Sequence, residues 1–91
     1  MKTLNLVLKR KWFDMIKSGE KKEEYSELKE YWRSRLFGKE YDVVTFYHGY
    51  SKDRESITFE VKSIHIGRGR EEWGGDGFKT FFIIELGKLI E

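Results

Sequence analysis

Apolar side chains recur at every second position near the start of the chain. Leu4, Leu6 and Leu8 show this period of two, which is typical of a strand that buries one face. We therefore predict a strand over residues 3–9. The next apolar residues change to another spacing, so the strand ends there.

Helical spacing begins at residue 11. Trp12, Phe13 and Ile16 fall on one side of a helix, and Gly19 follows where a helix commonly ends. We predict a short helix over residues 11–18. The charged segment at residues 20–25 has no turn residues, and its composition predicts an exposed loop or an edge strand.

A second helix is predicted over residues 27–37. Ser26 is a favourable N-cap residue, and Gly38 ends the apolar pattern. The apolar stripe of this helix consists of Leu28, Tyr31, Trp32 and Leu36.

The second half of the chain is rich in residues that favour strands. Residues 41–50 predict one strand, and residues 57–66 predict a longer one whose apolar positions change parity, which indicates a bulge near Lys62–Ser63. Residues 68–77 contain four glycines and predict a loop. The last strand, at 78–90, is apolar on both faces over residues 81–84, which predicts an interior position in the sheet.

The order is strand, helix, strand, helix, strand, strand, strand. This order predicts an α+β fold, with about five strands in a small mixed β-barrel and two short helices that cover one end. Because the chain has 91 residues, it can form one core, and we expect a single domain over 1–91.

Composition narrows the function classes. The chain has no cysteine and only two histidines, which lie far apart, so we predict no disulfide, no metal site and no cofactor. The apolar run at the N-terminus is too short for a signal peptide or a membrane span, and we expect a cytoplasmic protein without a membrane partner. A net charge of +2 gives little support for nucleic-acid binding, so the distribution of charge must supply it.

The segment from Gly19 to Ser26 reads GEKKEEYS. It resembles the ASCH motif, G-x-K-x-x-E-x-R, at three of the four fixed positions, namely Gly19, Lys21 and Glu24. The ending EWGGDGFKTFFIIELGKLI is similar to the closing half of small bacterial and phage ASCH proteins. The resemblance implies a PUA-like barrel with a cleft between barrel and helices, and contact with RNA, a nucleoside or a modified base.

Lys21 and Glu24 are the residues on which this interpretation depends. An ammonium can hold a phosphate or a base carbonyl, and a carboxylate can accept from an exocyclic amine. In a regular strand residues 21 and 24 point to opposite faces, so a shared cleft requires an irregular backbone. The alternative is a solvated charged edge that discourages aggregation.

Ser26 stands where the motif has arginine, and it cannot supply that charge. Arg33 or Arg35 could reach the same space. Aromatic rings near strand ends or in the glycine-rich loop could stack on a base, although the core also needs aromatic residues. The candidate ligand-binding residues are Gly19, Lys21, Glu24, Tyr25, Ser26, Arg33, Arg35, Tyr47, His48 and Trp73.

A catalytic role is the alternative to simple binding. Some ASCH proteins resemble amidohydrolases of N4-acylated cytidine, and others resemble ribonucleases. In the amidohydrolase pattern a threonine follows the lysine by three positions, and Glu24 stands there instead. Glu24 could act as a general base while Lys21 polarises a carbonyl, with Glu71 or Glu72 as a downstream acid. A third possibility is that the cleft is vestigial and the domain binds protein partners. The sequence leaves the oligomeric state open.

Overall fold

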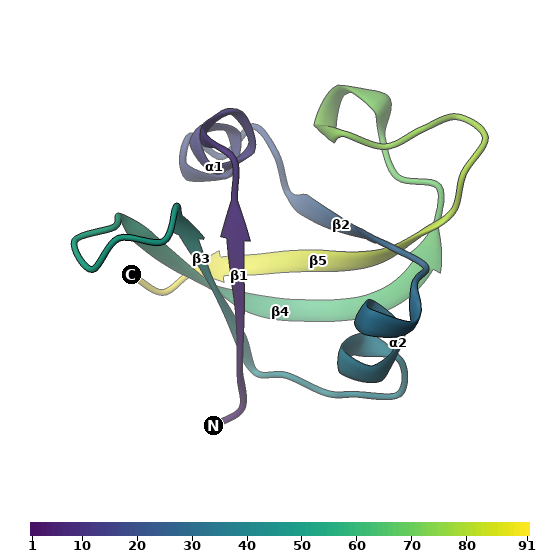
Figure 1. Cartoon of the computed structure of the whole chain (residues 1–91), viewed down its shortest axis with the longest axis horizontal. Coiled ribbons are helices and arrows are strands. Elements are labelled where there is room, and N and C mark those ends of the chain that lie inside the picture. The colour runs from purple at the N-terminus through teal and green to yellow at the C-terminus, as the bar shows by residue number, and fades with distance from the viewer.

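A five-stranded mixed sheet forms the body of the molecule in the computed structural model, which describes residues 1–91 (Figure 1). Its strands are β1 (Thr3–Leu8), β2 (Glu23–Glu27), β3 (Val43–His48), β4 (Ser56–Gly67) and β5 (Phe81–Leu89). The helices are α1 (Arg10–Lys17) and α2 (Glu30–Leu36), with one 3-10 turn, η1 (Glu71–Trp73). The predicted α+β class and the five strands are confirmed.

The strand order is β1-β3-β4-β5-β2, with β1 parallel to β3 and the other pairs antiparallel. The sheet curls into a half-barrel, and its edge strands β1 and β2 do not pair with each other. The register between β4 and β5 shifts between Phe59 and Val61 and again between Val61 and Ser63. The bulge predicted from the change of parity is therefore confirmed, and it lets one long strand bend with the sheet.

The core lies on the concave side of the sheet. Leu4, Leu6 and Leu8 are buried in alternation with exposed residues, as their spacing predicts. In β5 the residues from Phe82 to Ile84 are all buried, because this strand has neighbours on both edges and is covered on both faces.

The second helix begins later than its sequence pattern predicts. Ser26 belongs to β2, where it lies opposite Phe82, and the helix starts at Glu30 with Lys29 as its N-cap. Pairing with β5 fixes the extended backbone up to residue 27, and this tertiary contact overrides the capping preference of serine. Of the predicted apolar stripe only Leu36 is fully buried, while Leu28 and Tyr31 are exposed.

The two helices lie apart and do not cover one end of the sheet together, as Figure 1 shows. Phe13 and Ile16 of α1 and Leu36 of α2 nevertheless join the same hydrophobic cluster. The longer helix has eight residues, and no helix of the chain is long and apolar enough to cross a membrane.

Candidate functional site around Lys21 and Glu24

The backbone between α1 and β2 determines where Lys21 points. Helix α1 is followed by Gly19, whose φ of +88° favours glycine. The Lys21 N–H donates to the carbonyl of Met15 at 2.9 Å, and the Leu86 N–H donates to the carbonyl of Lys22 at 3.0 Å. This segment is thus attached to α1 and to β5 before β2 begins, so strand alternation does not fix the direction of Lys21.

Glu24 and Ser26 point toward the concave side of the sheet. They lie opposite Ile84 and Phe82, which are buried core residues of β5, and directly opposed residues point to the same face. Lys21 Nζ lies 3.2 Å from Glu24 Oε1. The irregular backbone that a shared cleft requires is therefore present, and the two charged groups are in contact.

The ammonium of Lys21 is almost fully enclosed. The residue is 2 % exposed, and Nζ donates a hydrogen bond to the carbonyl of Trp73. Nζ also lies 4.9 Å from the ring centroid of Trp12 and 4.7 Å from that of Tyr25, within cation–π range. One carboxylate, one carbonyl and two rings thus surround a single buried cation.

Burial has the largest effect on the ionisation of both partners. It lowers the pKa of Lys21, although the charge of Glu24 and its hydrogen bond act in the opposite direction. It raises the pKa of Glu24, although Lys21 opposes this. The cost of desolvation therefore exceeds the attraction between the two groups, and their ion pair does not fully offset the cost of burying the two charges.

The loop after β4 lies close over this pair because two of its glycines allow it. At Gly69, with φ of +72°, an added Cβ would lie 2.7 Å from the ring of Tyr25. At Gly74, with φ of +101°, it would lie 3.1 Å from the ring of Trp12. Tyr25 Oη accepts from the Arg70 N–H at 2.8 Å and fastens the loop to β2. The predicted special backbone angles of this loop are confirmed at both positions.

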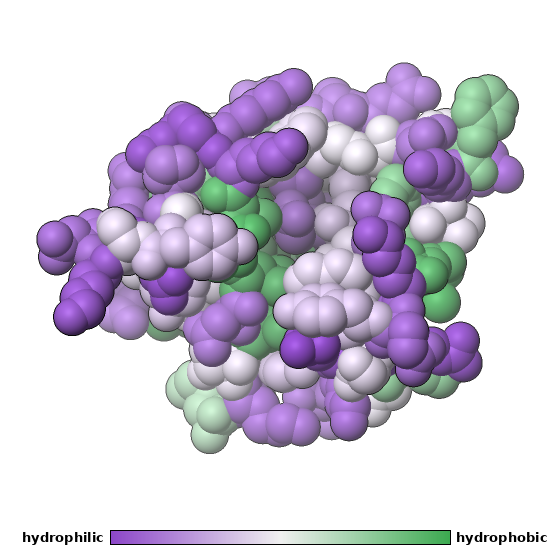
Figure 2. Space-filling view, viewed as in Figure 1, coloured by the Kyte–Doolittle hydropathy of each residue, from purple (hydrophilic) through white to green (hydrophobic).

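A cavity of about 60 Å³ lies at this junction, and its lining residues are Trp12, Lys21, Glu24, Tyr25, Trp73 and Gly74. Figure 2 shows that this face of the molecule is hollowed between α1, the loop after β4 and α2. We call the cavity with its six lining residues the Lys21 hollow.

Sequence reasoning did not select Trp12 as a site residue. Its position next to Phe13, one step off the buried stripe of α1, was the available signal, because such a residue lies at the border of the buried face. Trp12 is half-buried, unlike the fully buried Phe13.

Three other candidates, Ser26, Arg33 and Arg35, do not bring to the Lys21 hollow the positive charge that the motif arginine would provide. Ser26 is 7 % exposed and uncharged. Arg33 lies over the ring of Phe37, 5.1 Å from its centroid, and the guanidinium of Arg35 lies 3.7 Å from the centroid of Tyr31. Both arginines therefore contact aromatic rings of α2 or its C-cap.

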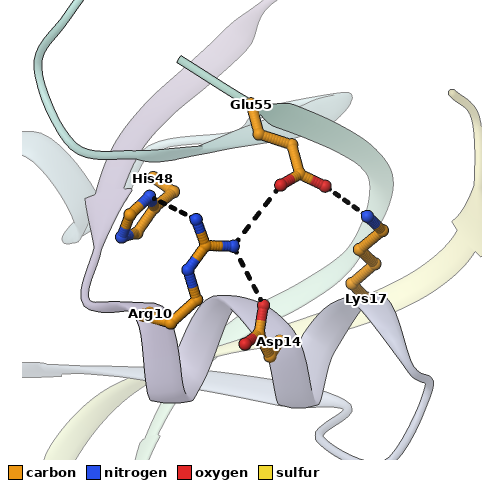
Figure 3. Close-up of polar contacts among 5 residues, drawn as sticks. All are labelled: Arg10, Asp14, Lys17, His48 and Glu55. Carbon is orange, nitrogen blue, oxygen red and sulfur yellow. Dashed lines mark hydrogen bonds and ion pairs between the residues drawn. The ribbon is translucent and has the colours of Figure 1, made fainter.

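Tyr47 and His48 belong to a different part of the surface. The guanidinium of Arg54 lies 3.9 Å from the ring centroid of Tyr47, and Arg10 Nη2 lies 3.0 Å from His48 Nδ1. Figure 3 shows that Arg10 also contacts Glu55. This cluster joins α1 to the segment around the β3–β4 turn and contributes nothing to the lining of the Lys21 hollow.

No three histidine, aspartate or glutamate side chains gather where they could hold a metal ion. Comparison of the chain with protein-family models, with curated proteins and with solved structures finds no match. The arguments for function therefore come from the residues and geometry of the site.

Proposed function

We propose that the chain is an ASCH-type domain with a PUA-like barrel, and that it binds RNA or a nucleoside at the Lys21 hollow. The observation that carries the proposal is the contact between the buried ammonium of Lys21 and the carboxylate of Glu24, 3.2 Å apart, beside the rings of Trp12 and Tyr25. This pair also belongs to the motif on which the resemblance rests.

The chemistry of the pair suits the edge of a base. A lysine ammonium donates to a base carbonyl, and a carboxylate accepts from an exocyclic amine or a ring N–H. Unpaired bases present such edges, and aromatic side chains stack on their faces. Trp12 and Trp73, both half-buried, line the same hollow. Cations already lie over both rings, Lys11 and Lys21 over Trp12 and Arg70 over Trp73, so a base would meet the edges of these rings or take the place of an exposed cation.

The size of the hollow limits how a ligand binds. About 60 Å³ is room for about two water molecules. The hollow therefore admits the polar edge of a base, whereas the sugar and phosphate remain outside it. This geometry favours an unpaired base that enters edge first.

Stability alone gives little reason to bury this pair. A buried ion pair contributes little net stability, because desolvation offsets the attraction, and apolar replacement is often neutral. Here the shifted pKa values of both groups point to incomplete compensation. Groups perturbed in this way at a hollow are candidates for ligand binding or catalysis.

Hydrolysis is the alternative use of the same residues. The raised pKa of Glu24 suits a general base, and Lys21 could polarise a carbonyl. The candidate downstream acids offer no support, because Glu71 and Glu72 are exposed and Glu72 pairs with Arg70 at 2.8 Å. The binding role therefore has the stronger physical basis.

The test uses the indole N–H signals of the three tryptophans in NMR spectra. Cytidine, N4-acetylcytidine and short single-stranded RNA are titrated, and chromatography follows product formation. We expect saturable shifts at Trp12 and Trp73 and none at Trp32, which lies on α2.

Lys21→Met should abolish the shifts, whereas Lys29→Met should keep them, because Lys29 is exposed and pairs with Glu27 at the surface. Release of acetate or cut RNA would favour the hydrolase. Absence of any shift with all three ligands would refute ligand binding at the hollow and favour protein partners.

A further inference from the structure

A second and larger cavity lies next to the Lys21 hollow. Its volume is about 550 Å³, within the range of small-molecule sites. Its apolar lining comes from Ile16 of α1, Phe59 and Val61 of β4, and Leu86 of β5. We call this cavity the lysine cleft.

Three lysines besides Lys21 line this cleft: Lys22, Lys62 and Lys88. Lys62 pairs with Glu85 at 3.7 Å, while Lys22 and Lys88 are exposed and form no ion pair within the chain. The only carboxylate in the lining is Glu60. The cleft therefore has a net positive charge, with two ammonium groups free to bind an anion.

Glu60 is held in a defined position across the two strands. Its Oε1 accepts from the Lys88 N–H at 3.1 Å. Gly87 leaves room for it, since a Cβ on Gly87 would lie 3.2 Å from Glu60 Cβ. Its other oxygen, Oε2, makes no hydrogen bond within the chain. A fixed acceptor thus lies beside free cations and an apolar surface.

We propose that the lysine cleft binds a ribonucleotide phosphate. Lys22 and Lys88 hold the phosphate, Glu60 accepts from a ribose hydroxyl, and the apolar lining contacts the base. The phosphate belongs to a free nucleotide or to the neighbouring residue of a strand whose base occupies the Lys21 hollow. Lys21 lines both cavities, so the two lie side by side, within reach of adjacent nucleotides of one strand.

The experiment records amide and indole spectra of the wild-type chain with four separate probes. These are cytidine 5′-monophosphate, cytidine, inorganic phosphate and the dinucleotide CpC. The amides of Gly19 and Gly87 report on the cleft, and the indoles of Trp12 and Trp73 report on the Lys21 hollow. The two sites are thus read separately in one sample.

We expect the monophosphate to shift the two glycine amides and to bind more tightly than cytidine or inorganic phosphate. Lys22→Gln and Lys88→Gln should each weaken binding by about tenfold, the loss of one charge-assisted hydrogen bond. Glu60→Gln removes a negative charge and exchanges the carboxylate acceptor for a weaker amide oxygen, so it should strengthen the binding of inorganic phosphate and reduce the preference for the monophosphate over inorganic phosphate. Lys52→Gln is the matched control, because Lys52 is an exposed lysine outside the cleft.

Two results support the proposal and identify the source of the phosphate. If CpC shifts the glycine amides and the indoles together, the phosphate belongs to a strand. If only the monophosphate shifts the glycine amides, the ligand is a free nucleotide.

The proposal is wrong if Lys22→Gln and Lys88→Gln bind the monophosphate as Lys52→Gln does, or if inorganic phosphate binds as tightly as the nucleotide. If the nucleotides shift the amides of Gly19 and Gly87 but no ligand shifts the indoles of Trp12 and Trp73, only the proposed function is refuted.

Discussion

Removing one partner of the Lys21–Glu24 pair should destabilise the chain far more than removing both. The two groups are 3.2 Å apart, and an effective dielectric constant of about 20 gives an attraction of about 5 kcal/mol at that distance. Desolvation opposes this attraction, as the lowered pKa of Lys21 and the raised pKa of Glu24 indicate. The net contribution of the intact pair to stability is therefore small.

Glu24→Leu leaves a buried ammonium without its carboxylate. The expected loss of unfolding free energy at neutral pH is about 3–5 kcal/mol, which corresponds to a midpoint roughly 15–25 °C lower for a domain of this size. Lys21→Met should lower the unfolding free energy by less. The side chain of Glu24 that it leaves unpaired is 13 % exposed and its carboxylate can reach water, whereas the side chain of Lys21 left by Glu24→Leu is 2 % exposed.

The double variant Lys21→Met/Glu24→Leu should lie within about 1 kcal/mol of the wild type, because no buried charge is left unpaired. Urea denaturation followed by far-UV circular dichroism measures all four members of the cycle. Glu27 and Lys29 form an exposed pair at 3.6 Å and serve as the control, with an expected coupling of less than about 1 kcal/mol.

The cycle also separates structure from function. The double variant should be folded and stable, yet the indole shifts with RNA or nucleoside should be absent. If the two single losses add up in the double variant, the pair is not coupled and the reasoning fails. If the stable double variant still binds, the site does not use this pair.

Three further results are expected. At neutral pH Glu55→Gln should be less stable than the wild type, and this difference should shrink as the pH falls below 4.5. The hydrogen bond from Lys17 lowers the pKa of Glu55 below its usual 4.5, so the ionised carboxylate stabilises the fold above that pH and this contribution is lost as the group is protonated. A difference in urea midpoints that does not change with pH would contradict this. Tyr25→Phe removes the acceptor of the Arg70 N–H and should cost about 1 kcal/mol. Faster hydrogen exchange at that amide is the measurement, and unchanged exchange would show that the loop is held elsewhere. Gly69→Ala should lower the thermal midpoint more than Gly38→Ala, since both positions have positive φ but only Gly69 lies against a ring; equal effects would mean that the ring moves away easily.

The sequence by itself determined most of the elements. A period of two at Leu4, Leu6 and Leu8 requires one buried face wherever the strand lies, because a strand alternates its faces. The change of parity in β4 required a bulge for the same reason. These properties are local, so the pattern of residues suffices to predict them.

The tertiary structure decided the features that depend on distant partners. Ser26 became a strand residue because β5 pairs with it, although its local preference favours a helix cap. Lys21 and Glu24 meet because hydrogen bonds to Met15 and Leu86 set the backbone before β2 begins.

The surroundings of Lys21 could not be read from local spacing either. The carbonyl that accepts from its ammonium belongs to Trp73, fifty-two positions along the chain. Long-range packing brings such groups together, and the period of the apolar residues contains no information about which side chains will face one another.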